Sequence, residues 1–302
     1  MERSYIDYIR SGVFDNHSPT LNPFDIVTCV GKPFERDSKV VFNEAAHCYT
    51  IEGQVMKRSV TQLVHEFFPA FNPKETAFKM LTRDDFYSLR RYEEYVVMLK
   101  DYDLNTPLDL EKAVELVTTS WEKNGSEQAK LGTTMHNTIE KYYTQEDVKI
   151  NSTPELKMFS DFDSYRASLG FVPFRSEQIV WDLDYSLAGS VDMLYINMKD
   201  IKKERPDIWL VDWKRSKEIK KRAYGSGENA RGKGPLTNKA NCNFEHYSLQ
   251  LNIYKHLLEK HYSVNITRMT LVILHPNQEG YKSFDVEDNQ GAVRDVMKSI
   301  TK

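Results

Sequence analysis

A short apolar segment that ends in charged residues constrains the fold of this chain more than any other feature. Residues 207–213 read Asp-Ile-Trp-Leu-Val-Asp-Trp, and Lys214 follows them. The aromatic and branched side chains predict a buried strand. Because side chains alternate along a strand, we expect Asp212 and Lys214 on one face and Trp213 on the other. Burying a carboxylate and an ammonium here is costly, which indicates either a strand-end ion pair or a functional site.

The segments around this strand predict a mixed sheet covered by helices. Helical patterns occupy residues 155–169, 244–261 and 290–300, and strand patterns occupy residues 178–184, 186–198 and 269–274. This order of helices and strands predicts an α/β fold with a mixed central sheet flanked by helices. A segment rich in glycine and lysine, residues 223–243, is expected to form a flexible loop outside that core.

The start of the chain has a different character. Residues 1–40 mix turn formers with short apolar pieces and predict an irregular arm. Residues 40–64 predict a hairpin that leads into a helix, and Ser59 is the expected N-cap of that helix.

The next segment is mainly helical in pattern, over residues 72–143. We expect separate helices over residues 82–101 and 108–119. The chain is long enough for one elaborated domain or two modest ones. The expected organisation is an N-terminal arm and helical elaboration over residues 1–120, followed by a core domain over residues 121–302.

Composition excludes several classes of protein. Of the 302 residues, 40% are hydrophobic, including 17 Tyr, 15 Phe and 4 Trp, so wholesale disorder is not expected. The sequence has no apolar run of the ~18–20 residues that span a bilayer, which argues against an integral membrane protein. Residues 1–20 contain several acids and no apolar stretch, and this predicts neither a secretory signal nor a mitochondrial transit peptide.

Cysteine usage favours a reducing compartment. The cysteines are too few and too scattered for a disulfide framework, a zinc ribbon or a four-cysteine iron–sulfur cluster; they are Cys29, Cys48 and Cys242. We therefore expect an intracellular protein of the cytoplasm or nucleus (of a host cell, if the source is viral) that is not secreted.

The distribution of charge is more informative than its total. The chain has 41 Lys and Arg against 44 Asp and Glu, a net charge of −3, whereas residues 199–239 alone carry 13 basic and 6 acidic residues. Such a basic run is either a solvated surface loop or a surface for a polyanion, since phosphate contacts dominate affinity for nucleic acids.

Three further motifs place polar side chains where they could converge with Asp212. Asp192 ends the segment Leu-Ala-Gly-Ser-Val-Asp on an expected strand, His136 and Glu140 are four residues apart on an expected helix, and so are Gln250 and Tyr254. Taken alone, each fits an ordinary role: a turn carboxylate, a structural histidine, or boundary residues of an amphipathic helix.

The residues that flank Asp192 are apolar. By strand alternation, Val191 and Met193 are expected on the face opposite to Asp192. The pattern therefore predicts a single carboxylate directed away from an apolar face of the sheet.

In their order and context, these motifs together resemble the PD-(D/E)XK nuclease superfamily, in its RecB-like exonuclease branch. The resemblance covers roughly residues 125–275, and its motifs are Gly132-Thr-Thr-Met-His-Asn-Thr-Ile-Glu140, Ala188-Gly-Ser-Val-Asp192, Asp212-Trp-Lys214 and Gln250-Leu-Asn-Ile-Tyr254. It implies a restriction-endonuclease-like core. Because the iron–sulfur cysteines of some relatives are absent from the sequence, the chain resembles the cluster-free members, which include mitochondrial genome maintenance exonucleases and viral or phage homologues.

The resemblance implies a divalent metal centre of Mg²⁺ or Mn²⁺ and no iron–sulfur cluster. Asp192, Asp212 and the backbone carbonyl of Trp213 would bind the metal, and His136 would add a nitrogen ligand that makes Mn²⁺ suitable. Lys214 would position or activate the attacking water and stabilise developing negative charge. Phosphodiester hydrolysis needs such a centre, because the cation polarises the phosphate and acidifies bound water.

Four further residues have accessory roles by resemblance. Gln250 and Tyr254 would organise the catalytic lysine and the substrate phosphate. Glu140 and Glu177 are either partners of the metal ligands, ligands of a second metal, or purely structural.

The basic run is then expected to contact the phosphates of nucleic acid without reading sequence. The residues expected to do so are Arg215, Lys217, Lys220, Lys221, Arg222, Arg231, Lys233 and Lys239.

The implied function is a metal-dependent deoxyribonuclease, in particular an exonuclease acting on single-stranded or open-ended DNA. Its expected partners are DNA and proteins of replication, recombination or repair, and it has no expected partner in a membrane. Two alternatives stay open from the sequence: a structure-specific or RNA-cleaving endonuclease, and a catalytically inactive protein that binds nucleic acid.

Overall fold

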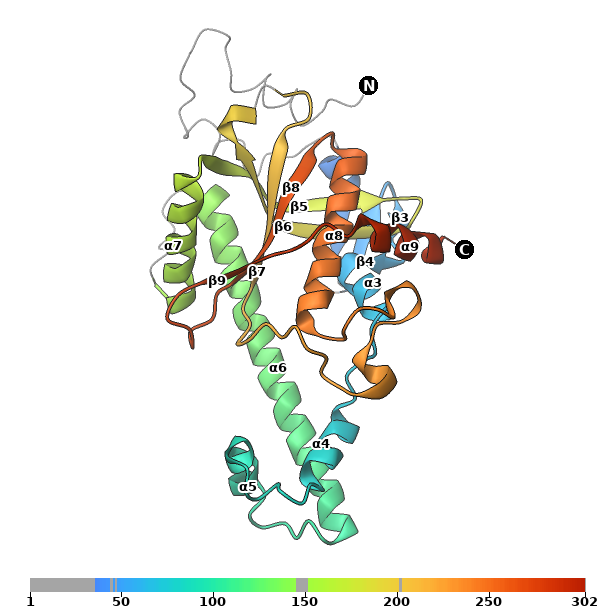
Figure 1. Cartoon of the computed structure of the whole chain (residues 1–302), viewed down its shortest axis with the longest axis vertical. Helices are drawn as coiled ribbons and strands as arrows, with labels where there is room; N and C mark the ends of the chain where they lie inside the picture. The colour runs from blue at the N-terminus through green and yellow to red at the C-terminus, as the bar shows by residue number, and fades with distance from the viewer. Residues whose placement is uncertain (1–35, 44–45, 47, 145–151, 201–202, 302) are drawn as a thin grey trace. The chain divides into compact units, whose positions relative to one another are not determined.

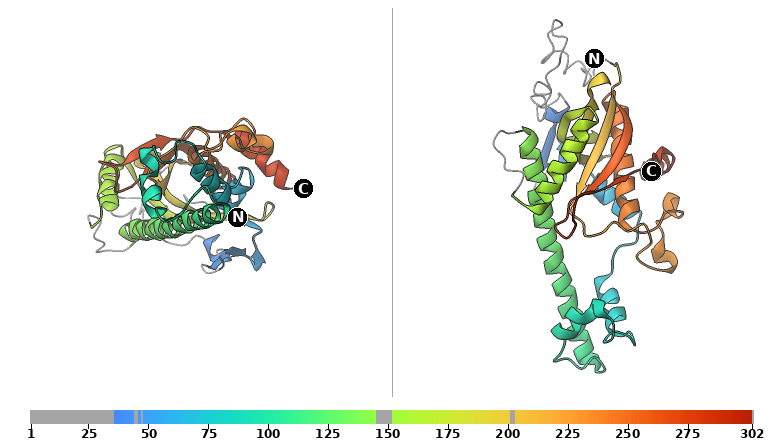
Figure 2. Two further views of the ribbon diagram at one scale, coloured as in Figure 1. Left: turned by 90° about the horizontal axis from the view of Figure 1, so that it is seen from below. Right: turned by 60° about the vertical axis from the view of Figure 1, so that its left-hand side comes forward.

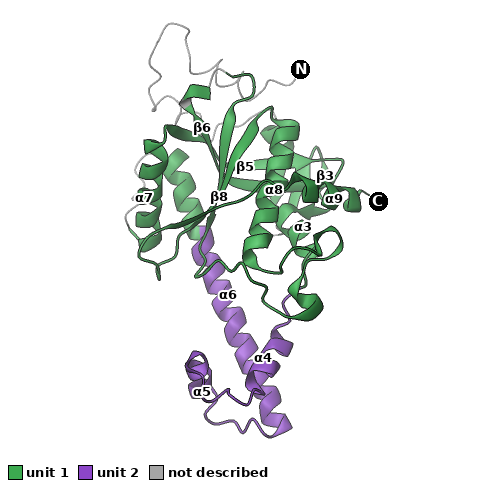
Figure 3. Cartoon of the chain, in the orientation of Figure 1, with its two compact units in different colours: residues 1–69, 134–302 green, residues 70–133 purple. Residues whose placement is uncertain are grey.

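The computed structural model describes residues 36–301, apart from residues 44–45, 47, 145–151 and 201–202. The irregular arm expected over residues 1–40 therefore lies almost entirely outside the described residues. The described chain divides into two compact units (Figure 3). Unit 1 contains the described residues before Ala70 and after Thr133, and unit 2 contains residues 70–133.

Unit 1 is built on a six-stranded mixed sheet (Figure 1). Its strands are β4 (Arg58–Ser59), β5 (Phe171–Asp182), β6 (Leu187–Asn197), β7 (Asp207–Lys214), β8 (Asn265–Ile273) and β9 (Lys282–Asp285). The order is β4-β6-β7-β8-β9, with β5 paired to β6. The pairs β4–β6 and β7–β8 are parallel, and the other pairs are antiparallel. The mixed α/β fold predicted from the sequence is confirmed.

Helices cover both faces of this sheet (Figures 1 and 2). One face packs against α3 (Val60–Glu66), α8 (Asn243–His261) and α9 (Gln290–Ile300). The other packs against α7 (Pro154–Ser168) and the last residues of α6 (Pro107–Thr144).

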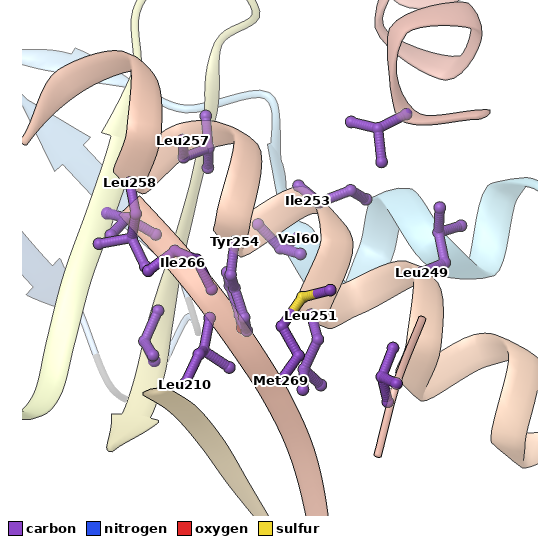
Figure 4. Packing of buried hydrophobic residues seen from close by; sticks show 14 of the residues in the cluster. Val60, Leu210, Leu249, Leu251, Ile253, Tyr254, Leu257, Leu258, Ile266 and Met269 are labelled. Atoms are coloured by element: carbon purple, nitrogen blue, oxygen red, sulfur yellow. The ribbon is translucent and has the colours of Figure 1, made fainter. Parts of the chain in front are cut away.

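The alternation of side chains along β7 explains this arrangement. Ile208 and Leu210 join the core beneath α8, which Figure 4 shows at close range. Trp209, Val211 and Trp213 join the core beneath α7. The predicted period-2 pattern of this strand is thereby confirmed.

The hairpin and helix predicted over residues 40–64 are also confirmed. A small sheet of β1 (Val40–Asn43), β2 (Cys48–Ile51) and β3 (Gln54–Val55) precedes β4. Ser59 caps α3 by accepting a hydrogen bond from the backbone N–H of Gln62, whose side chain accepts one from the Ser59 N–H in return. This capping box fixes the start of α3 beside the sheet.

The unit boundaries differ from the predicted division at residue 120. Residues 58–66 supply β4 and α3, which pair with β6 and pack against α8 in unit 1. The helix α6 continues through residue 120, so no linker occurs there. Local patterning could not show this, because the sheet contact of β4 joins residues 129 positions apart in the chain.

Unit 2 consists of α4 (Pro73–Leu81), the single turn Arg90–Tyr92, α5 (Glu93–Met98) and the part of α6 up to Thr133. The continuous helix predicted over residues 82–101 is wrong. Asp85 pairs with Arg83, and the Ser88 hydroxyl donates to the Asp85 backbone carbonyl. Such local side-chain contacts compete with helix formation.

The segment predicted as a flexible loop is folded. It contains short turns at Gly227–Ala230 and Gly234–Leu236, and it buries Leu236 in the core beneath α8. The backbone N–H of Lys233 donates to the Phe67 carbonyl, which ties the segment to the end of α3. The prediction of an unpacked flap is therefore wrong.

Among the described helices, none combines the length and apolar character needed to cross a bilayer.

Candidate metal and hydrolytic site

The candidate site lies where the edge of β6 changes partner. On the edge away from β5, β4 pairs with Leu187 and Ala188, and β7 pairs from Met193 onward. Residues 189–192 lie between these two pairings, and Asp192 is the last of them. The backbone N–H of Trp213 on β7 donates to Asp192 Oδ2 over 2.7 Å. The side chain of Asp192 thus links β6 to β7 next to the first residue of β6 whose backbone pairs with β7.

Three potential metal ligands converge at this point from three different elements. His136 of α6, Glu177 of β5 and Asp192 of β6 each offer one ligand atom, and these atoms lie within 4.8 Å of one another. His136 Nδ1 is 3.6 Å from Asp192 Oδ2 and 3.8 Å from Glu177 Oε1. The structure therefore brings together two predicted ligands, and it adds Glu177, which the sequence suggested only as accessory.

Glu177 reaches this position through an irregularity in the hairpin. The register pairs Ser176 with Met193 and Gln178 with Val191, so Glu177 lies opposite Asp192. Its φ of 47° is in the left-handed region, which non-glycine residues rarely adopt. Strand periodicity carries no signal for such a conformation, and this is why the sequence could not assign Glu177 to the ligand set.

The irregularity also changes the side-chain alternation of β6. Val191 packs in the core beneath α8, whereas Met193 packs in the core beneath α7. The prediction that both lie on one face is wrong, because the strand departs from period 2 around Asp192. Ser190 then supports the site, since its hydroxyl donates to Glu177 Oε2 over 2.8 Å.

Asp212 and Lys214 form the second half of the site. Lys214 Nζ lies 2.8 Å from Asp212 Oδ2, and both side chains are largely buried. The ammonium of Lys214 is therefore the partner of that Asp212 oxygen. The shared face predicted for this pair is confirmed, and Trp213 is buried on the opposite face of β7.

The charges of the site are strongly coupled. Burial lowers the pKa of His136, but the carboxylates of Asp192 and Glu177 outweigh it and raise that pKa to about 10. Burial also lowers the pKa of Lys214, and Asp212 and Asp192 raise it above the ordinary lysine value. For Asp212, burial raises the pKa, with Lys214 opposing the shift and Asp192 adding to it. Carboxylates crowded in a buried place in this way are stabilised by a cation.

Glu140 lies one turn after His136 on α6 and is half-buried. Burial and the nearby charge of Glu177 raise the pKa of Glu140. It is therefore electrostatically part of the acidic cluster, although it does not belong to the three-ligand group.

The helix α8 borders the site with one face. Gln250 Nε2 donates to Thr61 Oγ1 over 3.1 Å and to the Tyr254 hydroxyl over 3.2 Å. Tyr254 is buried, and Gly189 allows its close approach: a Cβ on Gly189 would lie 2.9 Å from Tyr254 Cε1 and 2.9 Å from Val60 Cγ2. The glycine of the Ala-Gly-Ser-Val-Asp segment is thus needed for packing.

The eight basic residues fall into two groups. Arg215 is buried in a 2.8 Å ion pair with Glu155, a place that does not suit a phosphate contact. Lys239 pairs with Glu245 at 3.2 Å, and Lys221 lies over the Phe244 ring. Lys221 is nevertheless exposed, and so are Lys217, Lys220, Arg222, Arg231 and Lys233.

Comparison with known proteins gives no family. No protein-family model matches the chain, and no curated protein matches it. Among solved structures, one described as "Crystal structure of SSO0001" is 12% identical, with a TM-score of 0.27, and the alignment covers 81% of this chain and 74% of that one.

The donor set itself fits a hard or borderline divalent cation. Carboxylate oxygens suit Mg²⁺ and Mn²⁺, and an imidazole nitrogen favours Mn²⁺ within that pair. His136, Glu177 and Asp192 would hold the cation, with Asp212 close by.

Proposed function

We propose that this protein is a divalent-metal-dependent nuclease that hydrolyses DNA phosphodiester bonds, acting as an exonuclease on single-stranded or open-ended DNA. One observation carries the proposal: a group of three potential metal ligands lies beside a buried Asp212–Lys214 pair, to which it is joined through the backbone of Trp213. The motifs that resemble the PD-(D/E)XK nucleases supply these residues except Glu177, which lies outside them, and Mg²⁺ or Mn²⁺ is the proposed cofactor.

Each group of the chain has a defined task in this reaction. A divalent cation, when bound, neutralises charge on the phosphate and acidifies a coordinated water. Lys214 provides an ammonium whose N–H groups can donate to the attacking water or a phosphate oxygen. Asp212 holds that ammonium at the end of β7, and Ser190 orients Glu177 by donating to the carboxylate oxygen Oε2.

Two features support nucleic acid as the substrate. The exposed basic residues follow Lys214 directly in the chain, so their backbone starts at the site. Their contacts with phosphates would be independent of sequence, as an exonuclease requires. DNA rather than RNA, action at ends and a role in DNA replication, recombination or repair inside the cell are parts of the proposal that come from the motif resemblance.

Digestion of matched DNA substrates tests the proposal. Purified protein is incubated with end-labelled linear single-stranded DNA, linear duplex DNA, circular single-stranded DNA or linear single-stranded RNA, with Mn²⁺, with Mg²⁺ or with a chelator. We expect metal-dependent loss of the linear substrates and persistence of the circle. Cleavage of the circle would replace the exonuclease by an endonuclease, and cleavage only of RNA would overturn the choice of DNA. No cleavage of any substrate with either metal would overturn the nuclease.

A further inference from the structure

The ammonium of Lys214 is held from two sides. On one side, Asp212 Oδ2 lies 2.8 Å from Nζ. On the other, Nζ lies over the ring of Tyr247, 4.9 Å from its centroid. An ammonium at this distance from a phenol ring is attracted by the negative face of the ring. Tyr247 is half-buried and packs against the core beneath α8, so the ring itself is well fixed.

The motif resemblance gives the task of organising the lysine to Gln250 and Tyr254. The side-chain amide N–H groups of Gln250 are directed elsewhere, to Thr61 of α3 and to the Tyr254 hydroxyl. Tyr247 lies three residues before Gln250 and shares its face of α8. Among the described residues of that helix, Tyr247 is the one whose ring receives the lysine.

A ring contact has a consequence that an additional carboxylate would not have. Lysine has a flexible four-carbon stem, so its ammonium needs contacts that fix its place. A second carboxylate would occupy N–H groups of the ammonium. An aromatic face attracts the charge without accepting a conventional hydrogen bond, so N–H groups remain available for the water or the phosphate.

We infer that Tyr247 is a positioning residue, which holds the Lys214 ammonium against Asp212 through its ring and not through its hydroxyl. The inference rests on the proposed nuclease function. The inference predicts different effects for two substitutions. Tyr247→Phe retains the ring. Tyr247→Leu removes the ring but keeps a large apolar side chain at this position, so the variant should still fold.

The contact can be measured without any activity. Lysines are labelled with ¹³C at Cε, and the Lys214 signal is identified by its loss in Lys214→Met. A ring above the ammonium shifts the attached protons upfield. We expect an upfield Lys214 signal in the wild type and in Tyr247→Phe, and an ordinary position in Tyr247→Leu. Tyr224→Leu is the matched control, because the Tyr224 ring lies near Lys220 instead, and it should leave the Lys214 signal in place.

Steady-state cleavage of linear DNA tests the consequence. Tyr247→Leu should lower kcat by about 3- to 30-fold, the range of a partly desolvated cation–π contact, with KM within about two-fold of the wild type. Tyr247→Phe should stay within about two-fold for both constants.

Four results would overturn the inference. An unshifted Lys214 signal in the wild type excludes the contact. If the wild-type Lys214 signal is shifted but Tyr247→Leu leaves kcat unchanged, Tyr247 does not position the lysine. If Tyr247→Leu raises KM and leaves kcat unchanged, Tyr247 contributes to substrate binding instead. If the wild-type protein hydrolyses no DNA, both the proposed nuclease function and the positioning role of Tyr247 are refuted. The NMR signals would still decide whether the contact between Tyr247 and Lys214 exists.

Discussion

At the residue scale, the positions of some side chains of the candidate site could be predicted from the sequence, and those of others could not. Asp212 and Lys214 could be placed on one face because β7 keeps a regular period of two. Glu177 could not be placed in the ligand group, because its left-handed backbone is a property of the folded hairpin. Tyr247 also carries no sequence signal, since an aromatic residue on an amphipathic helix is most often part of a core.

The metal site gives a prediction at this scale. Asp192→Asn removes a central anionic ligand and should abolish measurable Mn²⁺ binding by calorimetry, and Glu177→Gln should weaken it at least tenfold, or about 1.4 kcal/mol. His136→Ala should weaken Mn²⁺ more than Mg²⁺, because the smaller and harder ion depends less on nitrogen. The control is Asp184→Asn, which alters an exposed carboxylate. Unchanged Mn²⁺ affinity in Asp192→Asn would refute the assignment.

At the element scale, the fold could be predicted best where one helix or strand keeps one pattern. The sequence placed α9 and α8 within a residue of their observed bounds. It divided α6 and missed β9, a short strand whose four residues are exposed or half-buried and so lack an apolar pattern. It also took the glycines of residues 223–243 as a sign of mobility. Gly232 is instead packed, because a Cβ there would lie 2.6 Å from the Leu236 carbonyl oxygen.

The packing of α8 and α3 against β6 predicts the effect of a single methyl group. Gly189→Ala forces its Cβ against Tyr254 and Val60, and it should lower the free energy of unfolding by about 1–3 kcal/mol. Gly125→Ala is the matched control. It lies within α6 with open space around its Cβ position, so it should raise stability by about 0.5–1 kcal/mol through helix propensity. Urea unfolding measures both, and a neutral Gly189→Ala would show that α8 can shift away from the sheet.

The segment after β7 predicts a salt-dependent effect. Lys217, Arg222 and Lys233 are exposed, and their combined replacement by Ala should weaken binding of single-stranded DNA. It should also reduce the slope of log affinity against log salt by up to about 2, at ~0.7 per phosphate contact. The control removes equal charge elsewhere, with Lys282, Arg294 and Lys298 changed to Ala. Equal effects of the two triple variants would mean that net charge, and no particular surface, governs binding.

At the scale of the whole molecule, the sequence indicated the fold class but not the extent of the units. Local patterns follow neighbours in the chain, whereas unit 1 joins residues on both sides of unit 2. The contacts that close unit 1 are long-range ones, such as Arg58 with Leu187. Such pairings depend on complementary packing surfaces, which a single sequence does not show.

The pH dependence of stability is a prediction for the molecule as a whole. Burial, aided by His65, lowers the pKa of His246 from 6.5 to about 4. The unfolded chain therefore binds the proton more readily, so the stabilisation is complete above pH 6.5 and is lost as the pH falls toward 4. His246→Gln should show a smaller loss across this window in urea unfolding. An identical pH profile in the variant would contradict the assignment to His246.

The central claim, that the residues around Asp192 and Lys214 form a metal-dependent hydrolytic site, is tested most directly by one rate. The single-turnover cleavage of end-labelled, linear single-stranded DNA is measured at saturating Mn²⁺ for the wild type and for Lys214→Ala, with DNA binding measured in parallel and Lys298→Ala as the control. We predict metal-dependent cleavage by the wild type and the control, and no detectable cleavage by Lys214→Ala, which still binds DNA. A Lys214→Ala variant that keeps more than about a tenth of the wild-type rate has lost less than ~1.4 kcal/mol of barrier stabilisation and would contradict the claim.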